Sequence, residues 1–432
     1  MRAIADIYRS TEQLTPCTHD INATRRFYGT SRSGVAAALA LAVTAWPLAM
    51  ERAFAAGPGD FEIRIGNTMP YSGPAAAYGV IGKVIAAYFD KINAEGGING
   101  RKIKFISYDD GYSPPKTFEQ ARRLVESDEV LLIFNSLGTA PNTAIQKYMN
   151  SKKVPQLFVA SGATKWNDTK NFPWTMGWQP SYQSEAHIYA KYLMKEKPDA
   201  KIGVLYQNDD FGKDYLKGLK DGLGEKANSM IVLETTYETT DPTVDSQIVN
   251  LKSSGADVFL NVTIAKYAAQ AIRKAAEIGW KPVHFLNNVA TTISNALKPA
   301  GLDNSKGILS TFWIKDPTDP TWKDDAGYKE WVAFMDKWYP EGDKTDNVNA
   351  YSYTVAQTLM QVLKQCGDDL TRANIMKQVA NIHDLALPML LPGVQVNTSP
   401  TDFYPIKQMQ MARFDGERWV LFGPVISGAV TG

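Results

Sequence analysis

The sequence has few of the features that would cross-link a chain or give it a strong charge. Its 432 residues include only two cysteines and four histidines. Lys and Arg number 46 against 45 Asp and Glu, so the formal net charge is +1. A near-neutral chain lacks the basic field that a run of phosphates requires, and we therefore expect no nucleic-acid partner. What is present is 44% hydrophobic residues over a length that fits two domains of about 150 to 200 residues each.

The first 55 residues have the pattern of an export signal. A polar stretch with arginines precedes an apolar run at 35–50, which ends in the small-x-small sequence Ala53-Phe54-Ala55. The run is shorter than the roughly 20 residues of a membrane span, and Pro47 interrupts it. We predict a signal peptide over 1–55, cleaved after Ala55. The pair Arg25-Arg26 matches a twin-arginine signal only loosely, so Sec and Tat export both stay open.

Cysteine usage limits how the exported protein is held together. Cys17 would leave with the signal, and Cys366 would remain alone, so no disulfide could form within the chain. No cysteine follows the apolar run, and a lipid anchor at that junction is therefore not supported. We expect a protein that is free in the periplasm.

Beyond the signal, predicted strands and helices alternate. The segment 61–67 is typical of a strand, and 79–93 carries apolar residues at the spacing of one buried helix face. Similar units of about thirty residues recur, which predicts an α/β fold with mainly parallel sheets and helices on both faces. The rhythm breaks at 171–180 and near 309–315, where we expect the chain to cross between two lobes.

Two loops that follow predicted strands are candidate ligand-binding segments, because doubly wound sheets bind ligands beyond the carboxyl ends of their strands. After the strand at 130–134 comes Leu137-Gly138-Thr139, where Thr139 or Ala140 is expected to cap a helix with Pro141 in its first turn. Free amides at such a helix end attract an anion. After the strand at 154–160 comes Gly162-Ala163-Thr164, which offers small side chains and a hydroxyl. Together they suit a carboxylate, although both segments also read as ordinary strand-to-helix loops.

Longer motifs resemble a known family. Met69-Pro70-Tyr71-Ser72-Gly73-Pro74, Tyr78-Gly79 and the segment 93–100 resemble the mature N-terminus of type I periplasmic solute-binding proteins. More specifically, they are similar to the branched-chain amino-acid-binding (leucine/isoleucine/valine) group of ABC importers, and further matches span the exported chain: Tyr108-Asp109-Asp110, Val154-Pro155, Asp209-Asp210-Phe211-Gly212 and Gly255-Ala256-Asp257.

The resemblance implies two doubly wound, Rossmann-like lobes joined by three crossings. Lobe one would comprise about 57–178 and 311–404, and lobe two about 179–310 and 405–432. Solute would be trapped as the lobes close, and a membrane permease would recognise the closed form. The partners would thus be a small-molecule ligand and an ABC-importer permease, and we expect a monomer without cofactor.

The resemblance also implies a set of ligand-binding residues. Family loops that match 137–139 and 162–164 hold the ligand carboxylate, positions that match Tyr78 and Phe211 form aromatic walls, and lobe two contributes further contacts. The implied set is Tyr78, Leu137, Gly138, Thr139, Gly162, Ala163, Thr164, Phe211, Asn261, Thr263 and Asn288.

One stretch departs from the family pattern. Amino-acid binders of this group usually place an acid after the strand that matches 283–287, where it pairs with the ligand ammonium; here the residues are Asn287-Asn288-Val289-Ala290. A buried ammonium without an anionic partner costs several kcal/mol. Either Asp209 or Asp210 takes over this role, or the ligand is not an α-amino acid. Similar relatives bind aromatic acids, so benzoate and cinnamate derivatives are candidates, while simple turn formation also accounts for the Asn pair.

Alternative functions have weaker support. A secreted α/β hydrolase would use Ser136, but Phe134 stands where the nucleophile turn needs its first glycine. His187, His284 and His383 have no metal-ligand spacing. A ligand-sensing protein of the same fold is a further alternative. Aromatic residues could line the cleft, among them Trp313 and, more weakly, Tyr351; we expect no catalytic residue and no metal.

Overall fold

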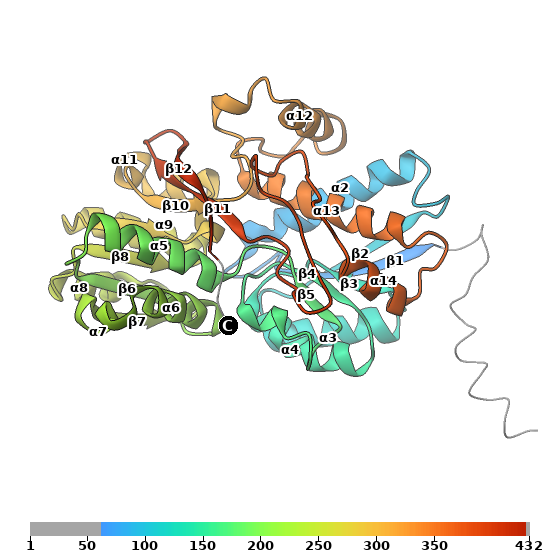
Figure 1. Cartoon of the computed structure of the whole chain (residues 1–432), viewed down its shortest axis with the longest axis horizontal. Coiled ribbons are helices and arrows are strands. Elements are labelled where there is room, and N and C mark those ends of the chain that lie inside the picture. The colour runs from blue at the N-terminus through green and yellow to red at the C-terminus, as the bar shows by residue number, and fades with distance from the viewer. Residues whose placement is uncertain (1–61, 429–432) are drawn as a thin grey trace, which may run out of the picture. The chain divides into compact units, whose positions relative to one another are not determined.

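Two β-sheets with helices on both faces make up residues 62–428, which are the residues that this computed structural model describes (Figure 1). The expected signal peptide and its cleavage point lie outside the described residues. The predicted α/β class with two mainly parallel lobes is confirmed.

The first sheet has five parallel strands in the order β2-β1-β3-β4-β5. Their bounds are β1 (Ile63–Met69), β2 (Ile103–Asp109), β3 (Leu132–Phe134), β4 (Gln156–Val159) and β5 (Thr175–Gly177). One pair of packed helices is α3 (Pro114–Glu126) and α4 (Thr139–Ser151), and another is α2 (Val80–Ala94) and α13 (Asn347–Gln365). Figure 1 shows α2 in blue beside α13 in orange, although more than 250 residues separate them in the sequence.

The second sheet has seven strands in the order β12-β11-β10-β9-β8-β6-β7. β11 runs antiparallel to both of its neighbours, and the other pairs are parallel. The bounds are β6 (Ile202–Gln207), β7 (Ile231–Tyr237), β8 (Val258–Val262), β9 (Val283–Leu286), β10 (Leu309–Phe312), β11 (Gln408–Phe414) and β12 (Trp419–Ser427). The longer helices of this lobe are α5 (Tyr182–Glu196), α6 (Asp210–Leu223), α8 (Asp245–Ser253) and α9 (Ala265–Glu277), and the shorter ones are α7 (Ala227–Met230), α10 (Lys298–Ala300) and α11 (Leu302–Ser305).

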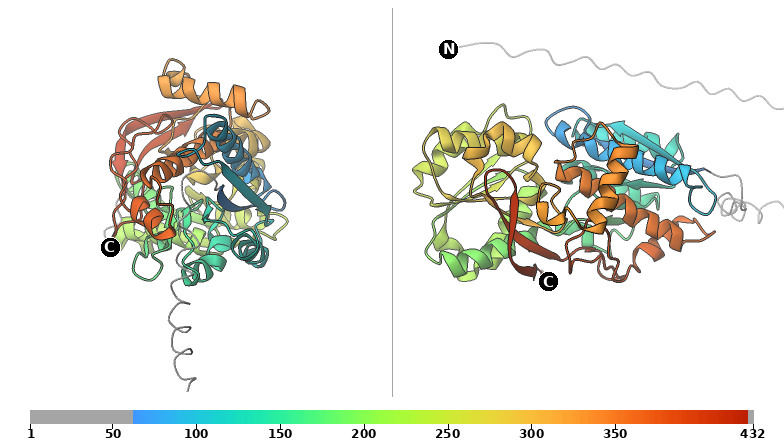
Figure 2. Two further views of the ribbon diagram at one scale, coloured as in Figure 1. Left: turned by 90° about the vertical axis from the view of Figure 1, so that its right-hand side faces the viewer. Right: turned by 90° about the horizontal axis from the view of Figure 1, so that it is seen from above.

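The chain passes between the two sheets three times. It leaves the first sheet after β5, and returns after β10 to form α12 (Ala326–Trp338), α13 and α14 (Arg372–Val379). Both α12 and α13 pack against α2, and α14 packs against α13. The third passage leads to β11 and β12, whose hairpin is the dark red element in Figure 2. Each lobe is therefore built from segments that are distant in sequence.

Local sequence explains these elements. α2 places Ile81, Val84, Ile85, Tyr88, Phe89 and Ile92 on one buried side, at the spacing of a single helix face. The strand β8 is buried at every residue, as expected for a strand covered by helices on both faces. No helix within residues 62–428 has the length and apolar character that crossing a membrane requires.

Candidate ligand-binding site

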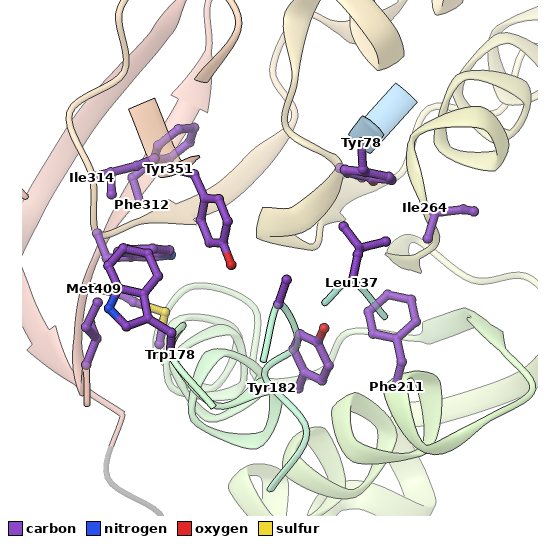
Figure 3. Close-up of a cluster of buried hydrophobic side chains, with 14 of the residues drawn as sticks. Tyr78, Leu137, Trp178, Tyr182, Phe211, Ile264, Phe312, Ile314, Tyr351 and Met409 are labelled. Atoms are coloured by element: carbon purple, nitrogen blue, oxygen red, sulfur yellow. The ribbon is translucent and has the colours of Figure 1, made fainter. Parts of the chain in front are cut away.

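A cavity of about 100 Å³ lies where strands of both sheets end (Figure 3). This volume approaches that of a protein cavity that takes up benzene, about 150 Å³. Lobe one supplies wall residues after β1, β3 and β4, and lobe two supplies others after β6, β8 and β9. The lining consists of Tyr78, Ile81, Tyr112, Leu137, Gly138, Thr139, Ala160, Gln179, Tyr182, Phe211, Ile264, Asn288, Val289, Thr291, Thr311, Phe312, Trp313, Ile314, Asn347, Val348 and Tyr351.

The predicted loop after β3 forms one wall. Leu137, Gly138 and Thr139 all line the cavity, and α4 begins there. The expectation that Thr139 or Ala140 caps this helix is wrong, because the N-cap is Gly138 at φ 99° and α4 starts at Thr139. A side chain at 138 would place Cβ 2.4 Å from the Tyr112 ring, so glycine is required by contact as well as by φ. Within the described part of the chain no side chain caps α4, and the first turn of this helix contains no acid.

The predicted loop after β4 lies outside the lining. Gly162 packs under the Tyr182 ring, and the carbonyl of Gly162 accepts a hydrogen bond from the Tyr182 amide (2.8 Å). Ala163 is buried. Thr164 donates its amide (2.6 Å) and its hydroxyl (3.0 Å) to the carboxylate of Asp214 on α6. The donors that were expected to hold a ligand carboxylate are thus engaged by a carboxylate of the chain itself.

Tyr78 closes the cavity from lobe one. Its hydroxyl donates to the Val289 carbonyl (2.9 Å) and accepts from the Ala265 amide (3.0 Å), and both partners belong to lobe two. Burial raises the pKa of Tyr78 well above its usual value, so the phenol keeps the proton that it donates. One hydroxyl therefore satisfies a donor and an acceptor on the opposite lobe.

Phe211 forms the opposing aromatic wall with Tyr182. Phe211 lines the cavity at the start of α6, and its ring meets the Tyr182 ring edge-on with centroids 5.0 Å apart. Tyr182 also stacks on Tyr215 at 4.9 Å. Burial raises the pKa of Tyr182 to about 12, so its hydroxyl stays neutral at ordinary pH.

Asn261 and Thr263 are buried behind the wall and do not line the cavity. The Thr263 hydroxyl donates to Asn261 Oδ1 (2.7 Å), and Asn261 Nδ2 lies 3.2 Å from His284 Nε2. Burial lowers the pKa of His284 to about 3, so this imidazole is neutral at ordinary pH. The neighbouring residue Ile264 makes the contact with the cavity.

Asn288 lines the cavity, and its buried side-chain Nδ2 has no hydrogen-bond partner among residues 62–428. Its backbone amide donates to the carboxyl of Glu185 (2.8 Å), one layer behind the wall. Glu185 also accepts from the hydroxyls of Tyr189 and Tyr215. Burial raises the pKa of Glu185 to about 7. Sequence reasoning missed this acid, because it lies on α5, far in sequence from Asn288.

Asp209 and Asp210, the acids proposed as partners of a ligand ammonium, do not line the cavity. Asp209 caps α6 by accepting from the amides of Phe211 (3.0 Å) and Gly212 (3.3 Å). Asp210 is exposed and forms an ion pair with Lys165 at 3.0 Å.

Aromatic residues that the sequence pattern only hinted at form the other end of the cavity. Figure 3 shows Tyr351, Phe312 and Ile314 there, with Trp178 beside them. The Trp313 ring meets the Trp178 ring at 5.0 Å, and the Tyr351 ring meets it at 5.2 Å, both edge-on. The Tyr351 hydroxyl accepts from Asn135 Nδ2 (2.9 Å), which fixes the ring. The signal that could have found this end is the aromatic enrichment around the second predicted crossing.

Ser136, the serine of the alternative hydrolase, is buried and outside the lining, and its hydroxyl accepts from the Thr68 amide at 3.0 Å. Over the part of the chain that the structure describes, no group of three or more His, Cys, Asp or Glu residues is arranged to hold a metal ion.

A doubly wound two-lobed fold with a cavity at its strand ends defines a class of proteins that hold a small solute between their lobes. Within this class, the chain belongs to the periplasmic binding protein family, whose model matches residues 62–418. The family predicted from the sequence is thereby confirmed.

Individual relatives agree with this assignment. The chain is 29% identical over 315 residues to Leu/Ile/Val-binding protein homolog 1 of Brucella abortus, a match that covers 71% of this chain and 80% of the relative. Its fold is similar to that of a branched-chain amino-acid ABC transporter protein from Thermus thermophilus with bound valine, with a TM-score of 0.77, 15% identity, and coverage of 85% and 97%. It is also similar to a fatty acid ABC transporter substrate-binding protein from Thermomonospora curvata, with a TM-score of 0.70, 21% identity, and coverage of 86% and 94%.

Proposed function

We propose that this protein is the substrate-binding component of an ABC importer and captures a small hydrophobic carboxylate, either a branched-chain amino acid or an aromatic acid. It acts in the periplasm as a monomer after export, and it releases its solute unchanged to a membrane permease. The observation that carries the proposal is the Tyr78 hydroxyl, which bonds Ala265 and Val289 across the cavity and so links closure of the lobes to enclosure of the solute.

The mechanism is a shift in population between open and closed forms. A ligand that touches both lobes binds the closed form more tightly and raises its share by that difference in affinity. Ligand contacts are assigned to the predicted residues that line the cavity, which are Tyr78, Leu137, Gly138, Thr139, Phe211 and Asn288. The predicted residues outside the lining, namely Gly162, Ala163, Thr164, Asn261 and Thr263, act through packing and closure.

The head of the ligand belongs at the start of α4. Uncapped amides and the positive end of the helix dipole attract a carboxylate there, and the Thr139 hydroxyl is close by. The body of the ligand lies among the aromatic walls. The body of the ligand differs among proteins of this fold, since one structure contains bound valine and another protein is named for a fatty acid.

A thermal-shift screen of protein stripped of bound ligand tests the proposal. The panel contains leucine, isoleucine and valine, and benzoate, 4-hydroxybenzoate and hydroxycinnamates. A ligand that binds only the folded state raises the melting temperature once it exceeds its Kd. We expect a rise with at least one of these groups, accompanied by a smaller radius of gyration in X-ray scattering; no response to any member would refute the proposed ligand class.

A further inference from the structure

The lining of the cavity is uncharged. Among its 21 residues, all within the described part of the chain, there is no Asp, Glu, Lys, Arg or His, whereas seven are aromatic. A charged group of a ligand enclosed there would find no ion-pair partner on the wall. Enclosing an unpaired charge in a closed, largely apolar site carries a large desolvation penalty.

The helix ends at this uncharged cavity determine which sign of ligand charge it favours. Helices that begin at it include α4, α5, α6, α9 and α13, because lining residues lie at their starts: Thr139, Tyr182, Phe211, Ile264 and Asn347. The N-terminus of a helix carries a partial positive charge. Acidic caps offset this charge at α6 and α13, where Asp209 and Asp346 accept the first-turn amides. Among residues 62–428 no side chain caps α4, whereas the Ser181 hydroxyl caps α5 and the neutral Tyr78 hydroxyl accepts from the Ala265 amide at the start of α9. The field that remains at α4 favours a negative group of the ligand and opposes a positive one.

Three buried or half-buried acids behind the cavity wall, Asp346, Glu185 and Asp214, are already engaged by the chain. Asp346 accepts from Val348 N (3.0 Å), from the Thr292 hydroxyl (3.0 Å) and from Asn295 Nδ2 (3.0 Å). Glu185 is enclosed by two tyrosine hydroxyls and the Asn288 amide, and Asp214 by Thr164 and Gln183. Each of these three carboxyl groups accepts its hydrogen bonds from groups of the protein, and none of the three residues lines the cavity.

Asn288 stands where a group of the ligand would meet lobe two. Its buried Nδ2 has no partner within the described chain, so it requires an acceptor such as a hydroxyl, carbonyl or ether oxygen. An ammonium has three donors and no acceptor, and it would leave this amide unsatisfied.

We infer that the ligand is a small organic acid without an amino group, with its acid head at the start of α4 and an uncharged body between the aromatic walls. This inference rests on the proposed function and selects, within its ligand class, against α-amino acids.

Calorimetry with matched pairs of ligands tests the inference on the wild-type protein. 3-Phenylpropanoate differs from phenylalanine, and 4-methylpentanoate from leucine, only by the amino group. For the pair that binds, we expect the deaminated acid to bind at least about 100-fold more tightly, the scale set by an unpaired buried charge. 3-Phenylpropanamide, which keeps the body and loses the charge, should bind more weakly than 3-phenylpropanoate.

The outcomes separate the two proposals. If an amino acid binds as tightly as its deaminated partner, the inference is refuted while the proposed function stands. If neither member of either pair binds, and no compound of the thermal-shift panel raises the melting temperature, both the proposed ligand class and the inference are refuted.

A variant at Asn288 provides a second test of the inference. Asn288→Asp adds a carboxylate to the wall, and we expect it to shift the ratio of the two affinities at least about tenfold toward the amino acid. The matched control Asn228→Asp places the same change on the exposed surface of lobe two and should leave the ratio unchanged. An unchanged ratio in a folded Asn288→Asp protein would contradict the placement of the ligand beside Asn288.

Discussion

Thr164 of lobe one and Asp214 of lobe two are joined by two kinds of hydrogen bond, from the backbone amide at 2.6 Å and from the hydroxyl at 3.0 Å. Burial raises the pKa of Asp214, while these bonds and one from Gln183 favour its ionised form. The contact therefore joins the two lobes at a point outside the cavity lining.

Removing this contact should weaken ligand binding. Hydrogen bonds to a charged group contribute about 1.5 to 3 kcal/mol, so we expect Asp214→Asn and Thr164→Val each to lower affinity about tenfold or more in calorimetry. The double variant should lose little beyond Asp214→Asn alone, because the hydroxyl bond that Thr164→Val removes is one of the bonds that Asp214→Asn also disrupts. Asp221→Asn, on the exposed side of α6, is the control. Additive losses in the double variant would contradict the shared contact.

Tyr78→Phe should also weaken binding, because it removes both bonds of the hydroxyl to lobe two. We expect a loss of about 30-fold in affinity, from about 1 kcal/mol for each of the two neutral hydrogen bonds. Tyr71→Phe is the matched control: its hydroxyl bonds Ser107 at 2.6 Å within lobe one. An affinity loss of equal size in Tyr71→Phe would show that the effect is not specific to closure.

Glu185 should make stability depend on pH. Its folded pKa of about 7 exceeds the ordinary 4.5, so the folded state holds a proton that the unfolded state has released between these values. The free energy of unfolding therefore falls as pH rises from about 4.5 to 7, by about 3 kcal/mol from this group, and is flat above. Denaturant unfolding of wild type and Glu185→Gln at pH 5 and pH 8 measures this contribution as a difference. The advantage of wild type over the variant should be larger at pH 5, and a larger advantage at pH 8 would reverse the assignment.

Gly138→Ala should destabilise the protein and close part of the cavity. Both φ 99° and the clash of Cβ with the Tyr112 ring oppose any side chain. Gly255→Ala is the control, because Gly255 also has positive φ but has open space around its Cβ position. Strained φ costs about 1 to 2 kcal/mol in both variants, and overpacking adds about 1 to 3 kcal/mol at 138 alone. Equal unfolding free energies for the two variants would mean that Tyr112 yields without cost.

Periodicity alone predicted much of the fold. The expected helix at 79–93 is α2 at 80–94, and the expected strand at 61–67 is β1 at 63–69. In these segments the spacing of apolar residues follows directly from which faces of the element are buried, so the sequence alone predicts them. The prediction of a helix cap at 139 or 140 was wrong because the Tyr112 ring, which belongs to another loop, leaves room only for glycine at the true cap, Gly138.

The site was less accessible to sequence reasoning. Thr164 has the hydroxyl that a carboxylate needs, but only the folded chain brings Asp214 to it from 50 residues away. Tyr351 lies on α13, and its place at the cavity depends on the chain's return to the first lobe. Glu185 and Asn288 meet across 103 residues. Long-range pairings of this kind leave no local pattern in the sequence.

The late position of β11 and β12 has a consequence for how the molecule is assembled. Until residues 408–427 have been synthesised, β10 is an unpaired edge of the second sheet, and until α13 has appeared, α2 lacks the helix that covers it. Neither lobe can complete its core from the first three hundred residues, so folding waits for contacts of long sequence separation, which form slowly. A truncated or stalled chain would expose a strand edge that invites aggregation.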